Sequence, residues 1–135
     1  MTEQKSQGQE QRRYVRISGH FPVDFTVVRL QDDLLDLPWS KGHTSNVSRG
    51  GICLETDILK EAVIRYLSKG NIYLDIRIHV SSTGKVIKAV AEVVWYKPME
   101  GCDKCFIIGL DFRSVVEDDL ELLLSLAHAD QKDAK

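Results

Sequence analysis

The feature that most constrains this fold is a strict alternation of apolar and polar residues over positions 72–80. The apolar members are Ile72, Leu74, Ile76, Ile78 and Val80. Because successive side chains of a strand point to opposite faces, this period of two predicts a β-strand with one buried face. The sequence Ser-Thr-Gly-Lys at 82–85 then predicts a turn that sends the chain back as a hairpin.

Five further segments also predict strands. Phe21, Val23, Phe25 and Val27 alternate with polar or small residues and predict one buried face. Residues 86–96 are apolar at most positions, which predicts that both faces of that strand are covered. The polar segment 32–42, which contains Pro38 and Gly42, predicts a loop. In chain order, the predicted strands are 21–27, 44–46, 52–56, 72–80, 86–96 and 106–112.

Two segments predict helices. Apolar residues between Leu59 and Leu67 recur at helical spacing and predict a short amphipathic helix that ends at Gly70. Ser114, followed three residues later by Glu117, predicts a capping box that opens a C-terminal helix. One side of that helix would carry Val116, Leu120, Leu123, Leu124 and Ala127. The sequence therefore predicts a mainly β fold: a six-stranded antiparallel barrel with the C-terminal helix packed on it and one short inserted helix.

Length and composition fit a single small domain. With 135 residues and 43% hydrophobic content, the chain can bury a core without staples. Its formal net charge of −2 argues against the basic field of general DNA or RNA binding. The sequence shows neither the apolar run of a signal peptide nor a membrane span, so we expect a cytoplasmic protein without membrane insertion. Residues 1–10 and 129–135 are expected to be disordered tails.

Two short motifs carry the candidate binding chemistry. Arg12 and Arg16 form an RxxxR pattern, and about thirty residues later Asn46, Ser48 and Gly51 form an NxSxxG pattern. A guanidinium group matches both the O6/N7 edge of guanine and the oxygens of a phosphate. The second motif adds an amide, a hydroxyl and glycine backbone that a ligand can approach closely.

In this order and spacing, the two motifs resemble the signature of the PilZ domain, a bacterial receptor family for the second messenger cyclic di-GMP. Residues 91–95 and 107–112 are similar to the last two barrel strands of that family, and the resemblance covers about residues 11–128. It implies a PilZ-type barrel that binds cyclic di-GMP as its ligand and needs no cofactor. Binding would order the N-terminal arm and so alter the interaction with a protein partner, which the sequence does not identify.

The resemblance also implies roles for individual residues. Arg12 and Arg16 would grip a guanine edge and a phosphate or second guanine. Asn46, where the family more often has Asp, would bind guanine, and Ser48 would donate to a phosphate at an anion-binding turn. Gly51 is expected to admit the ligand or to take a positive φ, so that Gly51→Val would abolish binding and leave the fold largely intact. The remaining candidate contacts are Gln11, Arg13, Arg49, Gly50 and Trp95.

Trp95 and the cysteines each allow more than one interpretation. Trp95 either stacks on a guanine, a contact worth about 1–3 kcal/mol, or plugs the end of the barrel. Cys53, Cys102 and Cys105 are expected to be thiols in a reducing compartment. Cys102 and Cys105 have the spacing of a metal knuckle, but no second ligand pair completes a zinc site, so no metal is expected. Redox pairing of these two cysteines stays open.

Two other functions compete with the receptor function. The first is a PilZ-fold adaptor that contacts proteins without any ligand. The second is a small barrel that binds single-stranded RNA, which 7% aromatic content and a negative net charge disfavour. No nucleophile with a base, phosphate-binding loop or dinucleotide motif is recognisable, so we expect no enzyme and assign no catalytic residue.

Overall fold

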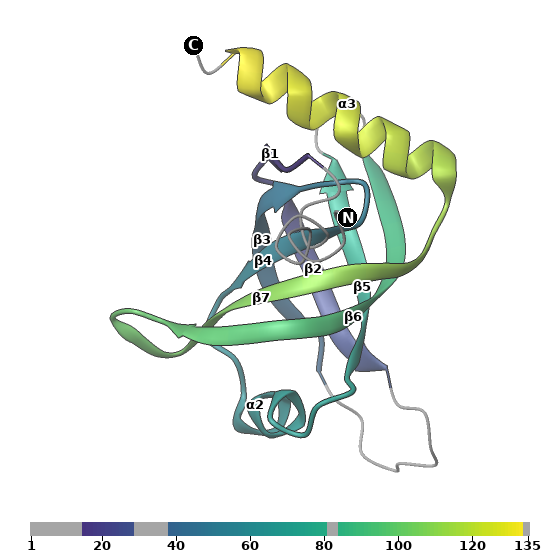
Figure 1. Ribbon diagram of the computed structural model, residues 1–135. Coiled ribbons are helices and arrows are strands. Elements are labelled where there is room, and N and C mark those ends of the chain that lie inside the picture. Colours follow the sequence, from purple (N-terminus) through teal and green to yellow (C-terminus); the bar gives the residue numbers. More distant parts are fainter. Residues whose placement is uncertain (1–14, 29–37, 81–83, 134–135) are drawn as a thin grey trace, which may run out of the picture.

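Six antiparallel strands close a barrel in the computed structural model, which describes residues 15–28, 38–80 and 84–133. The pairings run β3-β2-β5-β6-β7-β4 and return from β4 to β3, while the two-residue β1 is added to β3 (Figure 1). The prediction of a six-stranded barrel is therefore confirmed. The elements in chain order are β1 (Ile17–Ser18), β2 (Pro22–Val28), β3 (Ser40–Val47), β4 (Gly51–Thr56), α2 (Glu61–Leu67), β5 (Tyr73–Val80), β6 (Lys85–Met99), β7 (Cys102–Val115) and α3 (Glu117–Asp133).

The inside of the barrel is a continuous apolar core. Alternate residues of β5 fill its centre, and Leu74, Ile76 and Ile78 are fully buried. Val23 and Phe25 of β2 pack beside them, and their strand pairs with β5 through Val23–Ile78 and Phe25–Ile76. The period-two patterns of both strands are thus confirmed, because apolar side chains of one phase all enter the same core.

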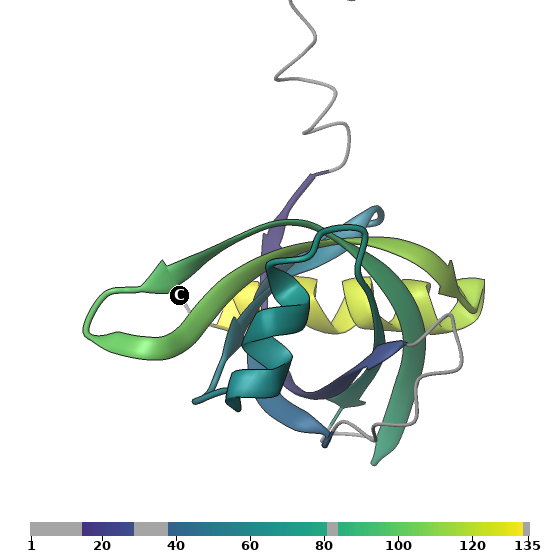
Figure 2. The same cartoon turned by 90° about the horizontal axis from the view of Figure 1, so that it is seen from below.

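The two helices cover opposite ends of the barrel (Figure 1), and Figure 2 shows α2 lying across the lower end. Leu59, which precedes α2, and Val63 and Leu67 of the helix are buried there. The helix ends at Leu67, earlier than the predicted stop at Gly70, and Gly70 takes a φ of +81° that favours glycine. Leu123 and Ala127 of α3 are buried at the other end. No helix within the described ranges is long and apolar enough to cross a membrane.

Two strand predictions need correction. β3 begins at Ser40, so the predicted loop is wrong for residues 40–42, while residues 29–37 lie outside the described part of the chain. Pairing with both β2 and β4 holds this polar segment in the sheet without an apolar alternation. β6 is not covered on both faces, because Val94 is 53% exposed and Trp95 is 40% exposed. Pairing with β5 ends at Glu92, and the remainder of β6 runs with β7 as a hairpin that projects from the barrel (Figure 2).

The predicted start of the last helix is also wrong. Ser114 lies in β7 opposite Val90, so it cannot cap α3, which begins at Glu117. Val116 is 61% exposed and does not belong to the buried side of the helix. The helix start is instead supported by acidic residues of the first turn, which interact favourably with the N-terminal end of the helix dipole.

Thr44 fixes the N-terminal segment to the barrel. Its buried hydroxyl donates to the carbonyl oxygen of Gly19 and accepts from the backbone N–H of Phe21 at 2.9 Å. We expect Thr44→Val to lower the free energy of unfolding by about 1–3 kcal/mol, because both backbone groups would lose a buried partner. Chemical denaturation measures this, and Thr44→Ser, which keeps the hydroxyl, is the control. Equal losses in the two variants would contradict the assignment.

Candidate functional site

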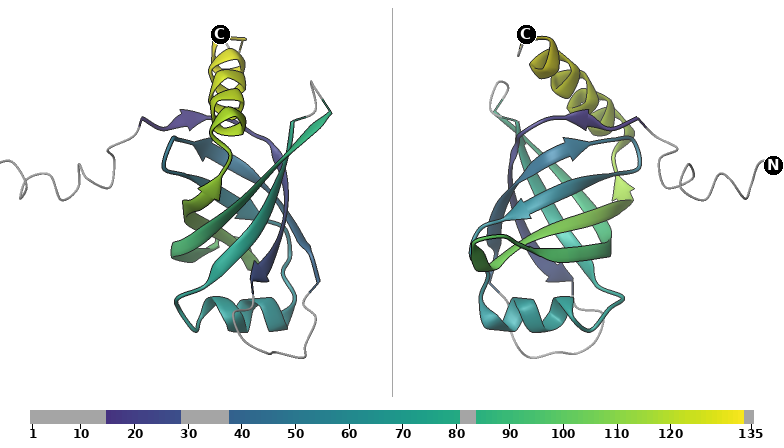
Figure 3. Two further views of the ribbon diagram at one scale, coloured as in Figure 1. Left: turned by 90° about the vertical axis from the view of Figure 1, so that its right-hand side faces the viewer. Right: turned by 60° about the vertical axis from the view of Figure 1, so that its left-hand side comes forward.

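Four strand pairings join five residues in a row across the outside of the barrel. Ser18 of β1 pairs with Asn46 of β3, and Asn46 pairs with Cys53 of β4. Cys53 pairs with Gly109 of β7, and Gly109 pairs with Trp95 of β6. The right-hand view of Figure 3 shows β3, β4 and β7 side by side below α3. We call these five residues the outer row.

The residues of the outer row face away from the core, because the residues before and after them in the same strands face inward. In β4, Ile52 and Leu54 are buried in the core on either side of Cys53. In β7, Ile108 and Leu110 are buried in the same way on either side of Gly109. Since strand side chains alternate between faces, Cys53 and Gly109 face the outer side of the sheet, although both residues are buried there. A ligand on this surface would therefore contact β-strands, not a cavity inside the barrel.

Trp95 supplies the aromatic surface of this row. A Cβ atom added to Gly109 would lie 2.2 Å from Nε1 of Trp95, so the indole ring lies directly over the glycine. The ring is still 40% exposed. Trp95 therefore lies on the outer surface of the barrel wall, and the interpretation that it plugs the barrel end is wrong.

The turn between β3 and β4 is held together by Ser48. Its hydroxyl accepts from the N–H groups of Gly50 and Gly51, both at 3.2 Å, and donates to the Gly51 carbonyl at 3.3 Å. The Ser48 N–H donates to the same carbonyl at 2.9 Å. Three of the four N–H groups of the turn are thus already bonded within it. The anion-binding concavity expected from the sequence is not present in this arrangement, and the hydroxyl stabilises the turn.

Gly51 is required by the packing of two strands. A Cβ atom at this position would lie 1.8 Å from the carbonyl oxygen of Leu110 and 3.1 Å from the Cα of Asp111. Positive φ values within the described residues occur at Gly70, Gly84, Gly101 and Asn71, and not at Gly51. The expectation that Gly51→Val leaves the fold largely intact is therefore wrong, because any side chain would push β4 away from β7.

Arg16 is the described member of the RxxxR motif. It lies one residue before the Ile17–Val47 pair, and Ser48 lies one residue after that pair on the neighbouring strand. The two residues are therefore close neighbours in the sheet. The Arg16 side chain is exposed, and no described residue forms an ion pair with it. Arg12, Arg13 and Gln11 lie outside the described residues.

Arg49 is engaged elsewhere in this structure. Its guanidinium forms ion pairs with Glu117 at 2.8 Å and with Glu121, both in α3. The hydrogen bond from Arg49, followed by its charge, lowers the pKa of Glu121. The pKa of Arg49 is raised by the same contacts. Arg49 thus ties the turn to α3.

Replacing Arg49 is expected to change the titration of Glu121. In Arg49→Met the pKa of Glu121 should rise towards its ordinary value, because the hydrogen bond and the positive charge are lost. Because the pKa of Glu121 is lower in the folded than in the unfolded state, its ionised form stabilises the fold at pH values above the unfolded-state pKa. This stabilisation is lost as the pH falls through the folded-state pKa, and the Arg49→Met variant should lack it. Carboxyl NMR titration measures the shift. Arg65→Met in α2 is the control, and a Glu121 titration unchanged by Arg49→Met would contradict the coupling.

Sequence reasoning missed three members of the outer row. These are Ser18, Cys53 and Gly109. The phase of the apolar residues in 52–56 and 106–112 already placed Cys53 and Gly109 on the outside, but only the strand register brings them next to Asn46.

Cys53 is a free, buried cysteine. Cys102 and Cys105 are joined by a disulfide, so the expectation that all three cysteines are thiols is wrong for this pair. The described residues include no cluster of three potential metal ligands.

Comparisons with known proteins identify the family. The PilZ domain model matches residues 10–129. Among solved structures, the PilZ domain of YcgR from Escherichia coli with c-di-GMP has a TM-score of 0.65 and 16% identity, covering 92% of this chain and 94% of that one. The Bacillus subtilis inhibitor of motility MotI/DgrA has a TM-score of 0.61 and 18% identity; the match covers 90% of this chain and 51% of MotI/DgrA. A search of curated proteins found no match. Because the PilZ domain model matches nearly the whole chain and the structure is a six-stranded barrel, this chain belongs to the PilZ domain family.

Proposed function

We propose that this protein is a cyclic di-GMP receptor and that the ligand binds on the outer row. The observation that carries the proposal is the position of Arg16 beside Ser48, next to the strand pair Ser18–Asn46. This position brings the second arginine of RxxxR to the NxSxxG turn from a distant part of the sequence. Family membership and the structural likeness to a PilZ domain solved with c-di-GMP support the same ligand.

The chemistry of the outer row suits a purine dinucleotide. Cyclic di-GMP has two phosphates and two guanines, so its site needs positive charge, hydrogen-bonding groups and an apolar surface. Arg16 supplies the charge and a planar fork, and the Asn46 amide can both donate to and accept from guanine. Trp95 offers an exposed ring for stacking at the other end of the row. Arg12 and Arg13, which precede Arg16 in the sequence, would add further positive charge.

Signalling would follow from ordering the segment that contains these arginines. Fixing a flexible residue costs about 1–2 kcal/mol, so binding would be coupled to a change in the N-terminal arm. β1 and the residue that follows it contact α3, since a Cβ at Gly19 would lie 3.2 Å from that of Ala127. A change in the arm would therefore reach the surface of α3, where a protein partner in the cytoplasm could detect it. The receptor would carry out no chemistry of its own.

Isothermal titration calorimetry with the full chain tests this proposal. Cyclic di-GMP should give saturable heat, whereas GMP and mixed RNA should give none, because neither presents two guanines on a ring closed by two phosphodiester groups. The stoichiometry would show whether one ligand or a stacked pair binds. A folded protein that gives no heat with cyclic di-GMP would refute the receptor function.

A ligand-independent adaptor is the second candidate function. Two observations favour it: the Ser48 hydroxyl is used within its own turn, and Arg49 is held by α3. In that case the outer row would be an interaction surface for a protein. The calorimetric experiment separates the two functions, because an adaptor would not respond to the nucleotide.

A further inference from the structure

The Cys102–Cys105 disulfide lies at the projecting end of the β6–β7 hairpin, away from the outer row. The two Cα atoms are 5.4 Å apart, and both side chains are half-buried. The β4–β7 pairing extends from Gly51–Asp111 at one end to Glu55–Ile107 at the other. The disulfide lies beyond the second end. It is thus separated along β7 from the turn that contains Ser48.

This disulfide is poorly suited to a purely structural role. It joins residues only three apart in sequence, and a short closed loop restricts the unfolded chain least. The barrel core does not depend on it, because the core is formed by apolar side chains from all six barrel strands. Disulfides of cytoplasmic proteins are usually transient and serve in catalysis or redox sensing. A partly exposed pair on a hairpin is accessible to small thiols.

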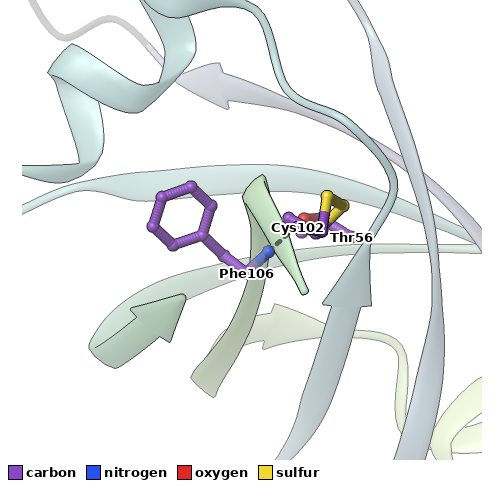
Figure 4. The surroundings of a disulfide bond; sticks show 4 residues. Thr56, Cys102 and Phe106 are labelled. Carbon is purple, nitrogen blue, oxygen red and sulfur yellow. Dashed lines mark hydrogen bonds between the residues drawn. A yellow bond between two sulfur atoms is a disulfide. The ribbon is translucent and has the colours of Figure 1, made fainter. Parts of the chain in front are cut away.

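The residues next to the disulfide connect it to the barrel. The Phe106 N–H donates to Oγ1 of buried Thr56 at 2.8 Å (Figure 4). The Leu59 N–H donates to the carbonyl oxygen of Lys104, between the two cysteines, at 2.9 Å. Residues 102–106, at the start of β7, contain the loop closed by the disulfide, and we call them the cysteine loop. The two bonds fasten this loop to segment 56–59, which runs from the last residue of β4 into the connection to α2. A change in the loop would therefore act directly on that segment.

The same loop forms one wall of an open depression of about 550 Å³. Its lining residues are His43, Glu55, Thr56, Asp57, Ile58, Met99, Cys102 and Cys105. Ile58 is 72% exposed on its rim. Both cysteines of the disulfide thus border a partly apolar surface hollow.

We propose that Cys102 and Cys105 form a reversible redox site that exchanges with low-molecular-weight disulfides of the glutathione type. One cysteine thiolate attacks a sulfur of glutathione disulfide, giving a mixed disulfide and releasing one glutathione thiolate. The second cysteine thiolate then attacks the sulfur of the first and releases the other glutathione. The protein dithiol is oxidised by two electrons, glutathione disulfide is reduced, and the two thiol protons end on the two released glutathiones. Oxidation fixes the cysteine loop and the depression beside it.

Equilibration of the full chain in buffers with different ratios of reduced to oxidised glutathione tests this site. Rapid alkylation of the folded protein, in which buried Cys53 is shielded, and intact-mass measurement should show two species, with two alkyl groups on the reduced form and none on the oxidised form. The Cys53→Ala variant should behave the same, whereas Cys102→Ser should accumulate a glutathione adduct on Cys105. The amide hydrogens of Leu59 and Phe106 should exchange severalfold more slowly in the oxidised protein.

Two results would overturn the proposal. One is a native chain that keeps both thiols in a large excess of glutathione disulfide. The other is exchange of the Leu59 and Phe106 amides at the same rate in both redox states, which would show that the loop does not control its surroundings. Neither result depends on nucleotide binding, so this test is independent of the receptor function.

Discussion

Gly51→Ala is expected to lower the free energy of unfolding by about 3 kcal/mol or more, although it adds a single methyl group. The new Cβ would meet the Leu110 carbonyl oxygen at 1.8 Å. That oxygen belongs to the backbone of the adjacent strand, so only a shift of β4 or β7 can relieve the clash. Urea denaturation should show a lower midpoint, and thermal denaturation should show a loss of roughly 10 °C.

Gly109→Ala is the matched control for Gly51→Ala. Both glycines are in the paired segments of β4 and β7, and the added atom is the same. At Gly109, however, the close neighbour is the half-exposed Trp95 ring, which can rotate outward. Its free energy of unfolding should fall much less. Similar losses for the two variants would contradict the view that Gly51 is required by backbone contact.

Arg16→Ala is expected to weaken cyclic di-GMP binding by about tenfold to a hundredfold, if the ligand binds on the outer row. A hydrogen bond to a charged group contributes about 1.5–3 kcal/mol, and each 1.4 kcal/mol is a factor of ten in affinity. The side chain is exposed and has no described ion-pair partner, so the fold should be unaffected. Calorimetry measures the affinity, and circular dichroism checks the fold.

Arg65→Ala is the control for Arg16→Ala. Arg65 is in the last turn of α2, at the opposite end of the barrel from α3 and β1 (Figure 1). Its removal changes the net charge by the same amount without touching the outer row. Equal weakening by the two variants would indicate general electrostatic attraction. Unchanged affinity in Arg16→Ala would exclude Arg16 from the site.

Strands with a clear apolar phase could be predicted from the sequence. The alternation in β2 and β5 identified their buried faces, because one phase is apolar at every position. The polar β3 could not be delimited in this way, since neighbouring strands hold Ser40 and Gly42 in the sheet. The apolar residues of β6 were misread as buried because the sequence does not show where pairing with β5 ends.

The candidate site was predictable as a set of motif residues but not as a surface. The spacing of the motifs drew attention to Arg16, Asn46 and Ser48. The role of Gly51 depends on the distance between β4 and β7, which no local pattern contains. The engagement of Arg49 by Glu117 is likewise a contact over 68 residues of sequence, and only the packing of α3 brings the two together.

The position of Trp95 gives the protein an intrinsic optical reporter. The other tryptophan, Trp39, lies against the guanidinium of Arg77 at 4.3 Å, and Trp39→Phe would leave the indole over Gly109 as the sole source of tryptophan emission. Since that ring is partly open to water on the barrel wall, any molecule that covers it would shift its fluorescence. Occupancy of this face can therefore be followed in real time and without a label.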